Sequence, residues 1–321
     1  MFVDLPLEEL EHYRPAVREP DDFDDFWTAQ LAAARTAGAP AQFVTVETPL
    51  ALDEVFDVTF AGHGGTPVRA WLLVPRDAPA DRPVVVEFIG YGGGRGDPLE
   101  WLGWSAAGYP HFVMDTRGQG GGSRRGDTFD TGDAGAPATP GFMTRGIADA
   151  KQHYFTRLFI DAALAVDAAT AHPATAGRRV VVTGRSQGGG LSLAAAHLNP
   201  GVAAALPDVA FLAHFRRALQ ITDALPYGEL VRYCAVRPGE VDNVFRTLSY
   251  IDVANHAKRA QAPALFSVGL VDEITPPSTV FAAYNYYAGA HKQIAVYPFN
   301  GHEGGGVVHF RRQLAFLAEL G

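Results

Sequence analysis

Hydrophobic positions gather in short runs along the chain, and their type and spacing predict strands that alternate with helices. Between residues 84 and 268 the runs are β-branched and only a few residues long, which suits strands buried on both faces of a parallel sheet. Earlier stretches of β-type pattern precede them. The predicted strands cover residues 43–48, 55–60, 68–74, 84–89, 112–114, 180–182, 264–268 and 294–297.

Between these runs, apolar residues recur at helical spacing. Residues 151–171 carry Phe155, Phe159, Ala162 and Val166 in this way, so a long helix is expected to lead towards the strand at 180–182. Further helices are predicted at 23–34, 191–198 and 307–320. The pattern indicates the α/β class: a mostly parallel sheet with an early antiparallel edge, flanked by helices.

The alternation of strand and helix is lost between about residues 207 and 252, where helix formers and aromatic residues dominate. We interpret this segment as a helical insert over the sheet. Without internal repeats, and with 47% hydrophobic and 19% charged residues in 321, the chain is expected to form a single domain over residues 1–321. About residues 1–40 would be an N-terminal extension.

Charge and cysteine content narrow the classes of partner. The formal net charge of -9 weighs against nucleic acid or an anionic membrane and favours a small, neutral or modestly polar substrate. Cys234 is the only cysteine, so we expect a packed side chain, with neither an intramolecular disulfide nor a thiolate metal cluster. No signal peptide and no apolar run of membrane-spanning length is visible. A soluble, cytoplasmic protein is the expectation.

A candidate nucleophile follows the strand at 180–182. The motif Gly184-Arg185-Ser186-Gln187-Gly188 stands between that strand and a helical pattern, which is the context of a nucleophile elbow. The flanking glycines would let strand and helix approach closely while Ser186 exposes its hydroxyl. The alternative is a chance match in a chain with 35 glycines, and we favour the nucleophile.

A serine hydroxyl needs a base, and the base needs an acid to orient it. Asp272 and His302 each come directly after a predicted strand, in the order Ser, Asp, His that is typical of α/β-hydrolases. Glu273 is the strongest alternative to Asp272. Other acids and histidines after Ser186 lie in the insert, on helices or away from strand ends; these are Asp208, Asp223, Asp242, Asp252, His256, His291 and His309.

An esterase also needs donors for the oxyanion. The backbone nitrogen of Gln187, at the start of a helix, is one candidate. The backbone nitrogen of Tyr91, in the glycine-rich residues 90–94 after the strand at 84–89, is the other; the alternative is a merely flexible loop. No dinucleotide or P-loop fingerprint is present. Arg117, after another strand, could bind a substrate carboxylate, but we favour a structural clamp.

Together these residues resemble the acetyl xylan esterases and cephalosporin C deacetylases of carbohydrate esterase family seven. The resemblance rests on Arg117-Gly118-Gln119, on the motif at 184–188 and on His302-Glu303. It extends to residues 90–96, 141–147, 263–272 and 276–285, and so covers nearly the whole chain. Two departures are Gly92, where relatives often carry asparagine, and Thr275, where many carry cysteine.

The resemblance implies an α/β-hydrolase fold with the triad Ser186, Asp272 and His302 and the oxyanion donors Tyr91 and Gln187. It also implies deacetylation of short xylo-oligosaccharides, other small acetyl esters and cephalosporin C, without metal or organic cofactor. Family members form ring-like homohexamers, and Pro226 and Tyr227 would lie near the pocket. Two alternatives remain: a peptidase or longer-chain lipase with the same triad, and a non-catalytic binding protein of this fold.

Overall fold

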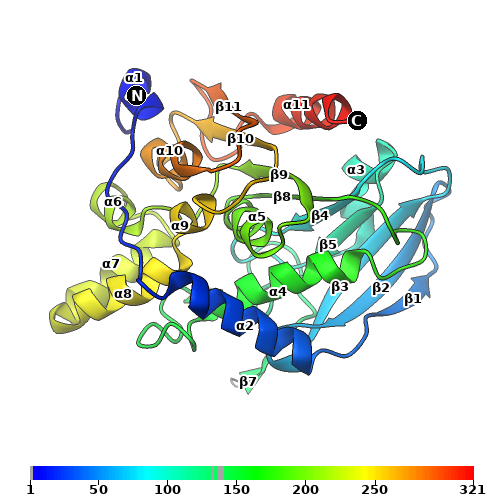
Figure 1. Ribbon diagram of the computed structural model, residues 1–321, viewed down its shortest axis with the longest axis horizontal. Coiled ribbons are helices and arrows are strands. Elements are labelled where there is room, and N and C mark those ends of the chain that lie inside the picture. Colours follow the sequence, from blue (N-terminus) through cyan, green and yellow to red (C-terminus); the bar gives the residue numbers. More distant parts are fainter. Residues whose placement is uncertain (1–2, 132–133, 136–140) are drawn as a thin grey trace.

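The computed structural model describes residues 3–131, 134–135 and 141–321. The first two residues of the expected N-terminal extension lie outside this part. A nine-stranded sheet runs through the molecule (Figure 1), in the order β1-β2-β3-β5-β4-β8-β9-β10-β11. The strands of this sheet are β1 (Gln42–Val46), β2 (Asp53–Ala61), β3 (Pro67–Pro75), β4 (Val84–Phe88), β5 (His111–Met114), β8 (Val180–Arg185), β9 (Val202–Asp208), β10 (Ala264–Gly269) and β11 (Lys292–Tyr297).

The sheet has an antiparallel edge and a parallel centre. Strands β1, β2 and β3 pair antiparallel, and β3 pairs antiparallel with β5. From β5 through β4, β8, β9 and β10 to β11 all pairs are parallel. The predicted fold class is therefore confirmed, including its antiparallel edge. A separate short pair, β6 (Asp130–Thr131) and β7 (Ala134–Gly135), lies outside this sheet.

Helices cover both faces of the sheet, and the alternation of residues along β4 shows how. Val84 and Val86 pack into the large core that includes α4 and α5, whereas Val85 packs with Trp104 of α3 and Phe316 of α11. The helices are α1 (Leu7–Glu11), α2 (Phe23–Ala37), α3 (Leu102–Ala106), α4 (Tyr154–Ala169), α5 (Gln187–Leu198), α6 (Phe215–Ile221), α7 (Tyr227–Val236), α8 (Val241–Ile251), α9 (Val253–Ala257), α10 (Pro277–Tyr286) and α11 (Gly306–Glu319), with 3-10 turns η1 (His63–Gly65), η2 (Pro98–Glu100) and η3 (Pro238–Glu240).

The pattern did not predict β9, which lies between β8 and β10. Its sequence is Val-Ala-Ala-Ala-Leu-Pro-Asp, and alanine favours helices rather than strands. Tertiary context decides here, because small side chains suit a central strand against which α5 packs closely. After β9 the chain forms α6 to α9 before β10 begins.

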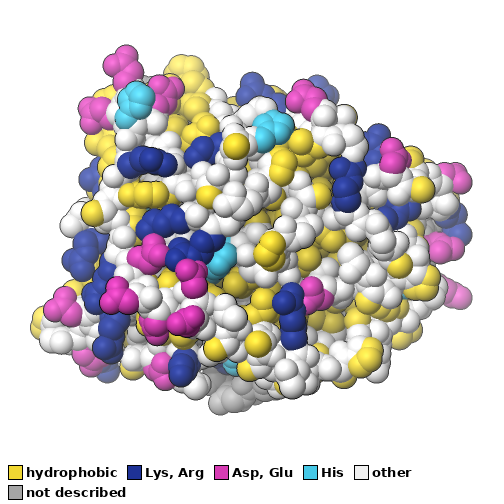
Figure 2. Space-filling view, viewed as in Figure 1, with side chains coloured by type: hydrophobic (Ala, Val, Ile, Leu, Met, Phe, Trp, Pro, Cys, Tyr) yellow, Lys and Arg dark blue, Asp and Glu magenta, His cyan; other side chains and the backbone are white. Residues whose placement is uncertain are grey.

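On the face shown in Figure 2, basic and acidic side chains are intermixed and gather mainly towards α6, α7 and α8. Along the described residues, no helix combines the length and apolar character needed to cross a membrane. The side chain of Cys234 is half-buried against the main core, and burial raises the pKa of its thiol.

Candidate active site

Ser186 occupies a sharp turn between β8 and α5. Its φ of 60° and ψ of -117° place it in a region that non-glycine residues rarely adopt. A side chain on Gly184 would meet the Phe88 carbonyl oxygen at 2.6 Å, and one on Gly188 would meet it at 2.1 Å. The strand and the helix can therefore approach only through these two glycines, and this is the geometry of a nucleophile elbow.

The end of β9 holds this turn in place. The backbone nitrogen of Ser186 donates to the Asp208 carbonyl oxygen at 2.9 Å, and the Ser186 carbonyl accepts from the Phe211 nitrogen at 3.0 Å. The Ser186 side chain is almost fully buried, and its hydroxyl makes no hydrogen bond within the described residues. The strained turn thus aims an unengaged hydroxyl from the carboxyl end of β8.

Asp272 and His302 meet at the same edge of the sheet, after β10 and β11. Nδ1 of His302 lies 2.9 Å from Oδ2 of Asp272, which is fully buried, while the imidazole is about a quarter exposed. Oδ1 of Asp272 accepts the backbone N–H groups of Ile274 at 2.8 Å and Thr275 at 2.9 Å. The Thr275 hydroxyl donates to Oδ2 at 2.7 Å. These donors fix the orientation of the carboxyl group, so that Oδ2 faces the imidazole.

The alternatives to this pair are engaged elsewhere. The Glu273 side chain is exposed, and its backbone carbonyl accepts the hydroxyl of Thr222. His309 lies on α11, where its Nε2 is 2.7 Å from Asp208. His256 is buried on α9 against Tyr250. The structure thus forms two histidine–aspartate pairs among these candidates. Only in the pair Asp272–His302 does each residue follow a strand and the imidazole reach solvent, since the His309 side chain is 1% exposed.

The backbone nitrogens of Tyr91 and Gln187 are both free of hydrogen-bond partners in the part of the chain that the structure describes. Gln187 begins α5, so its N–H is one of the groups that a helix N-terminus leaves unpaired. Tyr91 follows β4 in a turn closed by the hydrogen bond from Gly93 to Gly90 at 3.1 Å. Unpaired N–H groups beside a nucleophile are what an oxyanion hole requires.

The Tyr91 side chain reaches a residue that the sequence pattern did not single out. Its hydroxyl donates to Oε1 of Glu229 on α7 at 2.6 Å and accepts the N–H of Phe142 at 3.0 Å. The other Glu229 oxygen accepts the N–H of Met143 at 3.0 Å. Burial and the nearby carboxylate raise the pKa of Tyr91 well above its usual range, so the hydroxyl keeps its proton. Glu229 lies far from Tyr91 in the sequence, and no motif marks it.

Arg117 is a clamp rather than a free cation. Its guanidinium lies 2.5 and 2.7 Å from the two carboxylate oxygens of Asp161, and 3.3 Å from Asp130. Although burial acts in the opposite direction, these carboxylates raise the pKa of Arg117. With its side chain only 1% exposed, it has no surface to offer a substrate, in agreement with the structural role that we favoured.

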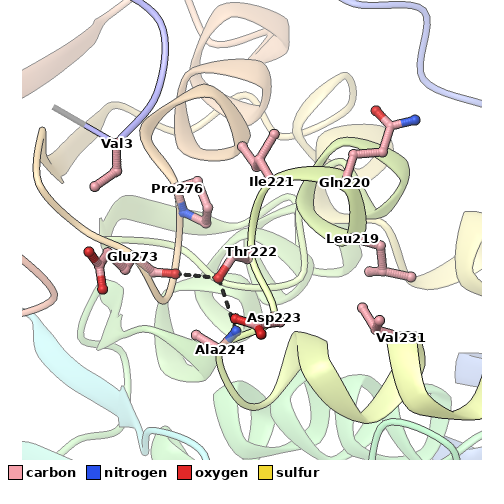
Figure 3. Close-up of a pocket in the computed structure, with 10 residues that line it drawn as sticks. All are labelled: Val3, Leu219, Gln220, Ile221, Thr222, Asp223, Ala224, Val231, Glu273 and Pro276. Atoms are coloured by element: carbon pink, nitrogen blue, oxygen red, sulfur yellow. Dashed lines mark hydrogen bonds between the residues drawn. The ribbon is translucent and has the colours of Figure 1, made fainter.

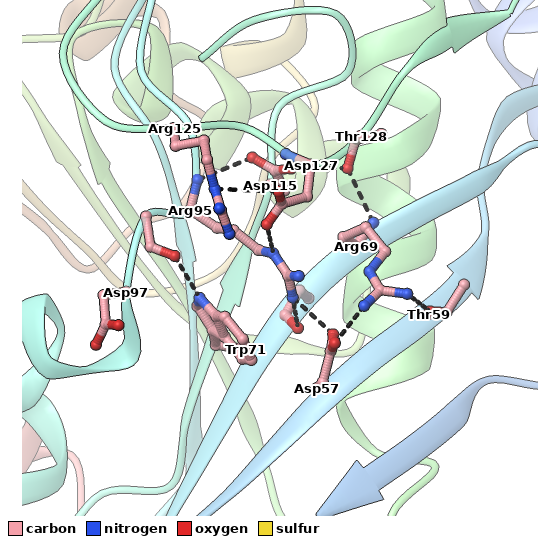
Figure 4. A network of polar contacts seen from close by, with 12 residues as sticks. Asp57, Thr59, Arg69, Trp71, Arg95, Asp97, Asp115, Arg125, Asp127 and Thr128 are labelled. Carbon is pink, nitrogen blue, oxygen red and sulfur yellow. Dashed lines mark hydrogen bonds and ion pairs between the residues drawn. The ribbon is translucent and has the colours of Figure 1, made fainter. Parts of the chain in front are cut away.

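A second buried arginine holds the far end of the loop after β4 (Figure 4). The Arg95 guanidinium lies between Asp57 at 2.7 Å and Asp127 at 3.0 Å, and covers the ring of Trp71 at 3.9 Å. The Arg95 backbone N–H donates to Asp115 at 2.8 Å. Burial raises the pKa of Asp115, although several donors oppose this. The loop is therefore tied to the neighbouring strands β2, β3 and β5.

Two cavities flank this edge of the sheet. One, of about 440 Å³, lies between α6, α7 and the Glu273–Pro276 side of the acid loop (Figure 3); Thr222 joins its walls by donating to the Glu273 carbonyl at 2.7 Å. The other has a volume of about 370 Å³, and its lining includes Gly90, Arg185 and Glu303. These three residues are the chain neighbours of Tyr91, Ser186 and His302. Among the described residues, Ser186, His302 and Tyr91 line neither cavity.

Pro226 and Tyr227, the two residues expected near the pocket, are both buried and line neither of these cavities. Tyr227 is fully buried, with its hydroxyl donating to the Ala213 carbonyl at 3.2 Å and its ring 4.5 Å from that of Phe211. Pro226 is also buried and follows the segment 219–224 that lines the cavity. Within the described residues, no group of three or more His, Cys, Asp or Glu side chains is arranged to hold a metal ion.

Comparisons with known proteins show the family to which this chain belongs. The model of the acetyl xylan esterase family matches residues 1–320. Solved acetyl xylan esterases from Paenibacillus sp. R4 (36% identity, TM-score 0.89, 98% of this chain and 99% of that one) and Thermoanaerobacterium sp. JW/SL YS485 (35%, 0.87, 99% of both) are similar throughout. Acetyl esterase Axe7A of Xylanibacter ruminicola is 27% identical over 91% of this chain, which spans 65% of that relative's length. This chain belongs to the acetyl xylan esterase family.

Proposed function

We propose that this protein is a serine esterase that removes acetyl groups from small acetylated substrates. The observation that carries the proposal is the Asp272–His302 pair, at 2.9 Å, on the sheet edge that also presents Ser186 in a strained elbow. Membership of the acetyl xylan esterase family supports a carboxylic ester hydrolase. The names of the relatives support acetate as the group that is removed.

The proposed cycle needs only groups of this chain. His302 takes the Ser186 proton as the hydroxyl attacks the acetyl carbonyl, and Asp272 holds the imidazole tautomer. The backbone N–H groups of Tyr91 and Gln187 bind the oxyanion. The alcohol leaves with the proton from His302, and water activated by the same imidazole then releases acetate and restores Ser186.

The proposal also covers the substrates, the pocket residues, the domain organisation, the location and the assembly of the protein. Acetylated xylo-oligosaccharides and cephalosporin C are the proposed substrates, with Pro226 and Tyr227 supporting a pocket wall. A single domain and a cytoplasmic location are proposed from the sequence pattern, and a homohexameric assembly is proposed from the resemblance. Acetate release from each substrate, and light scattering on the purified protein, would test substrate and assembly separately.

Replacement of the nucleophile is the main test. Ser186→Ala should lower kcat for p-nitrophenyl acetate by about 10⁶-fold, because the covalent route is lost. Ser249→Ala is the matched control, since its buried hydroxyl bonds only the Arg246 carbonyl on α8, and it should retain wild-type activity. A fluorophosphonate probe should add mass to Ser186 in the wild-type protein. Substantial turnover by Ser186→Ala, with contaminating esterase excluded, contradicts the proposal.

Two alternatives are separated by simple assays. A longer-chain lipase or a peptidase would prefer butyrate and longer acyl groups, or cleave a peptide amide, whereas the proposed enzyme should prefer acetate. A binding protein of this fold would form no Ser186 adduct and would release no acetate.

A further inference from the structure

The side chain of Gln119 lies between the two loops that carry the proposed oxyanion donors. We propose that Gln119 is a positioning residue for the reaction: its amide sets the distance between the backbone N–H groups of Tyr91 and Gln187. The proposal rests on the proposed function. It assigns a task in catalysis to a side chain that would touch neither substrate nor nucleophile.

The contacts surround Tyr91 on both sides. Oε1 of Gln119 accepts the N–H of Gly92 at 2.6 Å, and its Nε2 donates to Oε1 of Gln187 at 2.8 Å. The Gln187 side chain in turn donates from Nε2 to the Ile89 carbonyl at 2.9 Å. Two facing amides therefore connect the start of α5 to the loop after β4, just before and just after Tyr91.

The backbone dictates which way each amide faces. A backbone N–H can only donate, so the N–H of Gly92 requires the oxygen of Gln119. A carbonyl can only accept, so that of Ile89 requires the nitrogen of Gln187. The Gln119 amide also donates to the Tyr154 hydroxyl at 3.0 Å, which donates to the Arg117 carbonyl at 2.6 Å. This leaves a single consistent arrangement of donors and acceptors.

Burial makes the arrangement hard to replace. Gln119 and Gln187 are fully buried, and Gly92 is buried too, so water is poorly placed to substitute for a lost bond. The loop itself consists mainly of glycine, and Gly92 has a φ of +81°. Backbone hydrogen bonds from Gly122 to Gly92 and from Gly94 to Arg124, both 3.0 Å, hold one side of this segment, and the amide pair links its other side to α5.

The position of these two N–H groups should matter for the transition state more than for substrate binding. An oxyanion hole works only when its donors stand at hydrogen-bond distance from the developing charge, and a misplacement of about 1 Å can cost about 100-fold in rate. Ground-state binding of a small acetyl ester depends much less on these two N–H groups. Loss of the Gln119 amide should therefore lower kcat and leave KM nearly unchanged.

Gln119→Met tests this directly, because it keeps the length of the side chain and removes both hydrogen-bonding atoms. We expect kcat for p-nitrophenyl acetate to fall about 100-fold, with KM within about threefold. Affinity for a boronic acid, whose adduct with Ser186 places an oxygen in the oxyanion hole, should fall in parallel. Rates are expressed per active site, counted by fluorophosphonate titration, so that unfolded protein does not contribute.

Gln119→Glu adds a pH test. A protonated carboxyl keeps an acceptor for the N–H of Gly92 and one donor for Oε1 of Gln187, and loses only the second donor that the amide gives to Tyr154. The carboxylate can only accept, and it would oppose Oε1 of Gln187. The ratio of variant to wild-type kcat should therefore rise as the pH falls from 9 to 5. Dividing by the wild-type rate removes the titration that the two proteins share.

Asn199→Leu is the matched control. This amide is also buried, but it lies at the C-terminal end of α5, where its Nδ2 donates to the carbonyls of Ala195 at 3.1 Å and Ala163 at 3.3 Å, and we expect wild-type kcat and boronic acid affinity. The proposal is overturned if Gln119→Met behaves like this control per active site, if KM carries the loss, or if the Gln119→Glu ratio does not change with pH. Failure of the proposed function looks different, because wild-type turnover would then not depend on Ser186.

Discussion

The two halves of the site are held in different ways. On the acid–base side, Asp272 receives hydrogen bonds from Ile274 and Thr275, two and three residues further along the same loop. On the oxyanion side, Gly92 is held by Gln119, 27 residues away, and Tyr91 by Glu229, 138 residues away. The carboxylate is thus positioned by its own loop, whereas the oxyanion donors depend on distant parts of the chain.

The two halves of the site also differ in how far their side chains are exposed to solvent. The His302 side chain is 26% exposed, so solvent and substrate can reach the imidazole. Gln119 and Gln187 are fully buried. A proton carrier must exchange with water during the cycle, whereas electrostatic stabilisation is strongest where donors are fixed in advance and water is excluded. We therefore expect substitutions of the residues that hold the oxyanion donors to lower kcat more than substitutions of the residues that hold the Asp272 carboxylate.

The largest effect should come from the acid itself. Asp272→Asn should lower kcat by about 10⁴-fold, because the amide no longer selects the imidazole tautomer or stabilises its cation. The measurement is kcat for p-nitrophenyl acetate. Glu273→Gln is the control, since this exposed neighbour makes no side-chain contact with His302 in the described residues, and activity should stay within about twofold. Equal losses in both variants would remove the assignment of Asp272.

A smaller effect is expected from the distant support of Tyr91. Tyr91→Phe keeps the ring but removes the hydroxyl that bonds Glu229 and Phe142, and so leaves buried groups unsatisfied at a cost of about 1–3 kcal/mol. We expect a lower Tm and a fall in kcat of about tenfold. Tyr233→Phe, on the same helix as Glu229 and bonded to Glu240 at 2.9 Å, should change neither quantity. If Tyr91→Phe lowers Tm but leaves kcat unchanged, the hydrogen bond to Glu229 stabilises the fold and does not contribute to the rate.

The smallest effect is expected from local support of the acid. Thr275→Val removes the hydroxyl that donates to Asp272 at 2.7 Å but keeps the backbone N–H. One lost hydrogen bond corresponds to about 1 kcal/mol, or about fivefold in kcat. Thr170→Val, at the exposed end of α4, is the control. If Thr275→Val lowers kcat more than Tyr91→Phe does, the contrast between the two halves of the site is wrong.

Local sequence was sufficient for much of the fold and for the placement of the candidate triad. Short β-branched runs located β4, β5, β8 and β10, and the motif at 184–188 between a strand and a helix marked the turn at Ser186. Strand ends then placed Asp272 and His302 at one edge, since the carboxyl ends of parallel strands share it. Alanine-rich β9 was missed, because packing against α5 outweighs the helical preference of alanine.

The support of the oxyanion donors belongs to the tertiary structure alone. Gln119 stands in a motif that the sequence marks, yet nothing in the motif says that its amide faces Gly92 and Gln187. Glu229 stands in no motif at all. Hydrogen bonds between residues far apart in the chain form only when the fold has brought β4, β5 and α7 together. Their strength depends on burial, which the same folding step produces. The residues of the candidate site can thus be located from the sequence, and the contacts that hold them cannot.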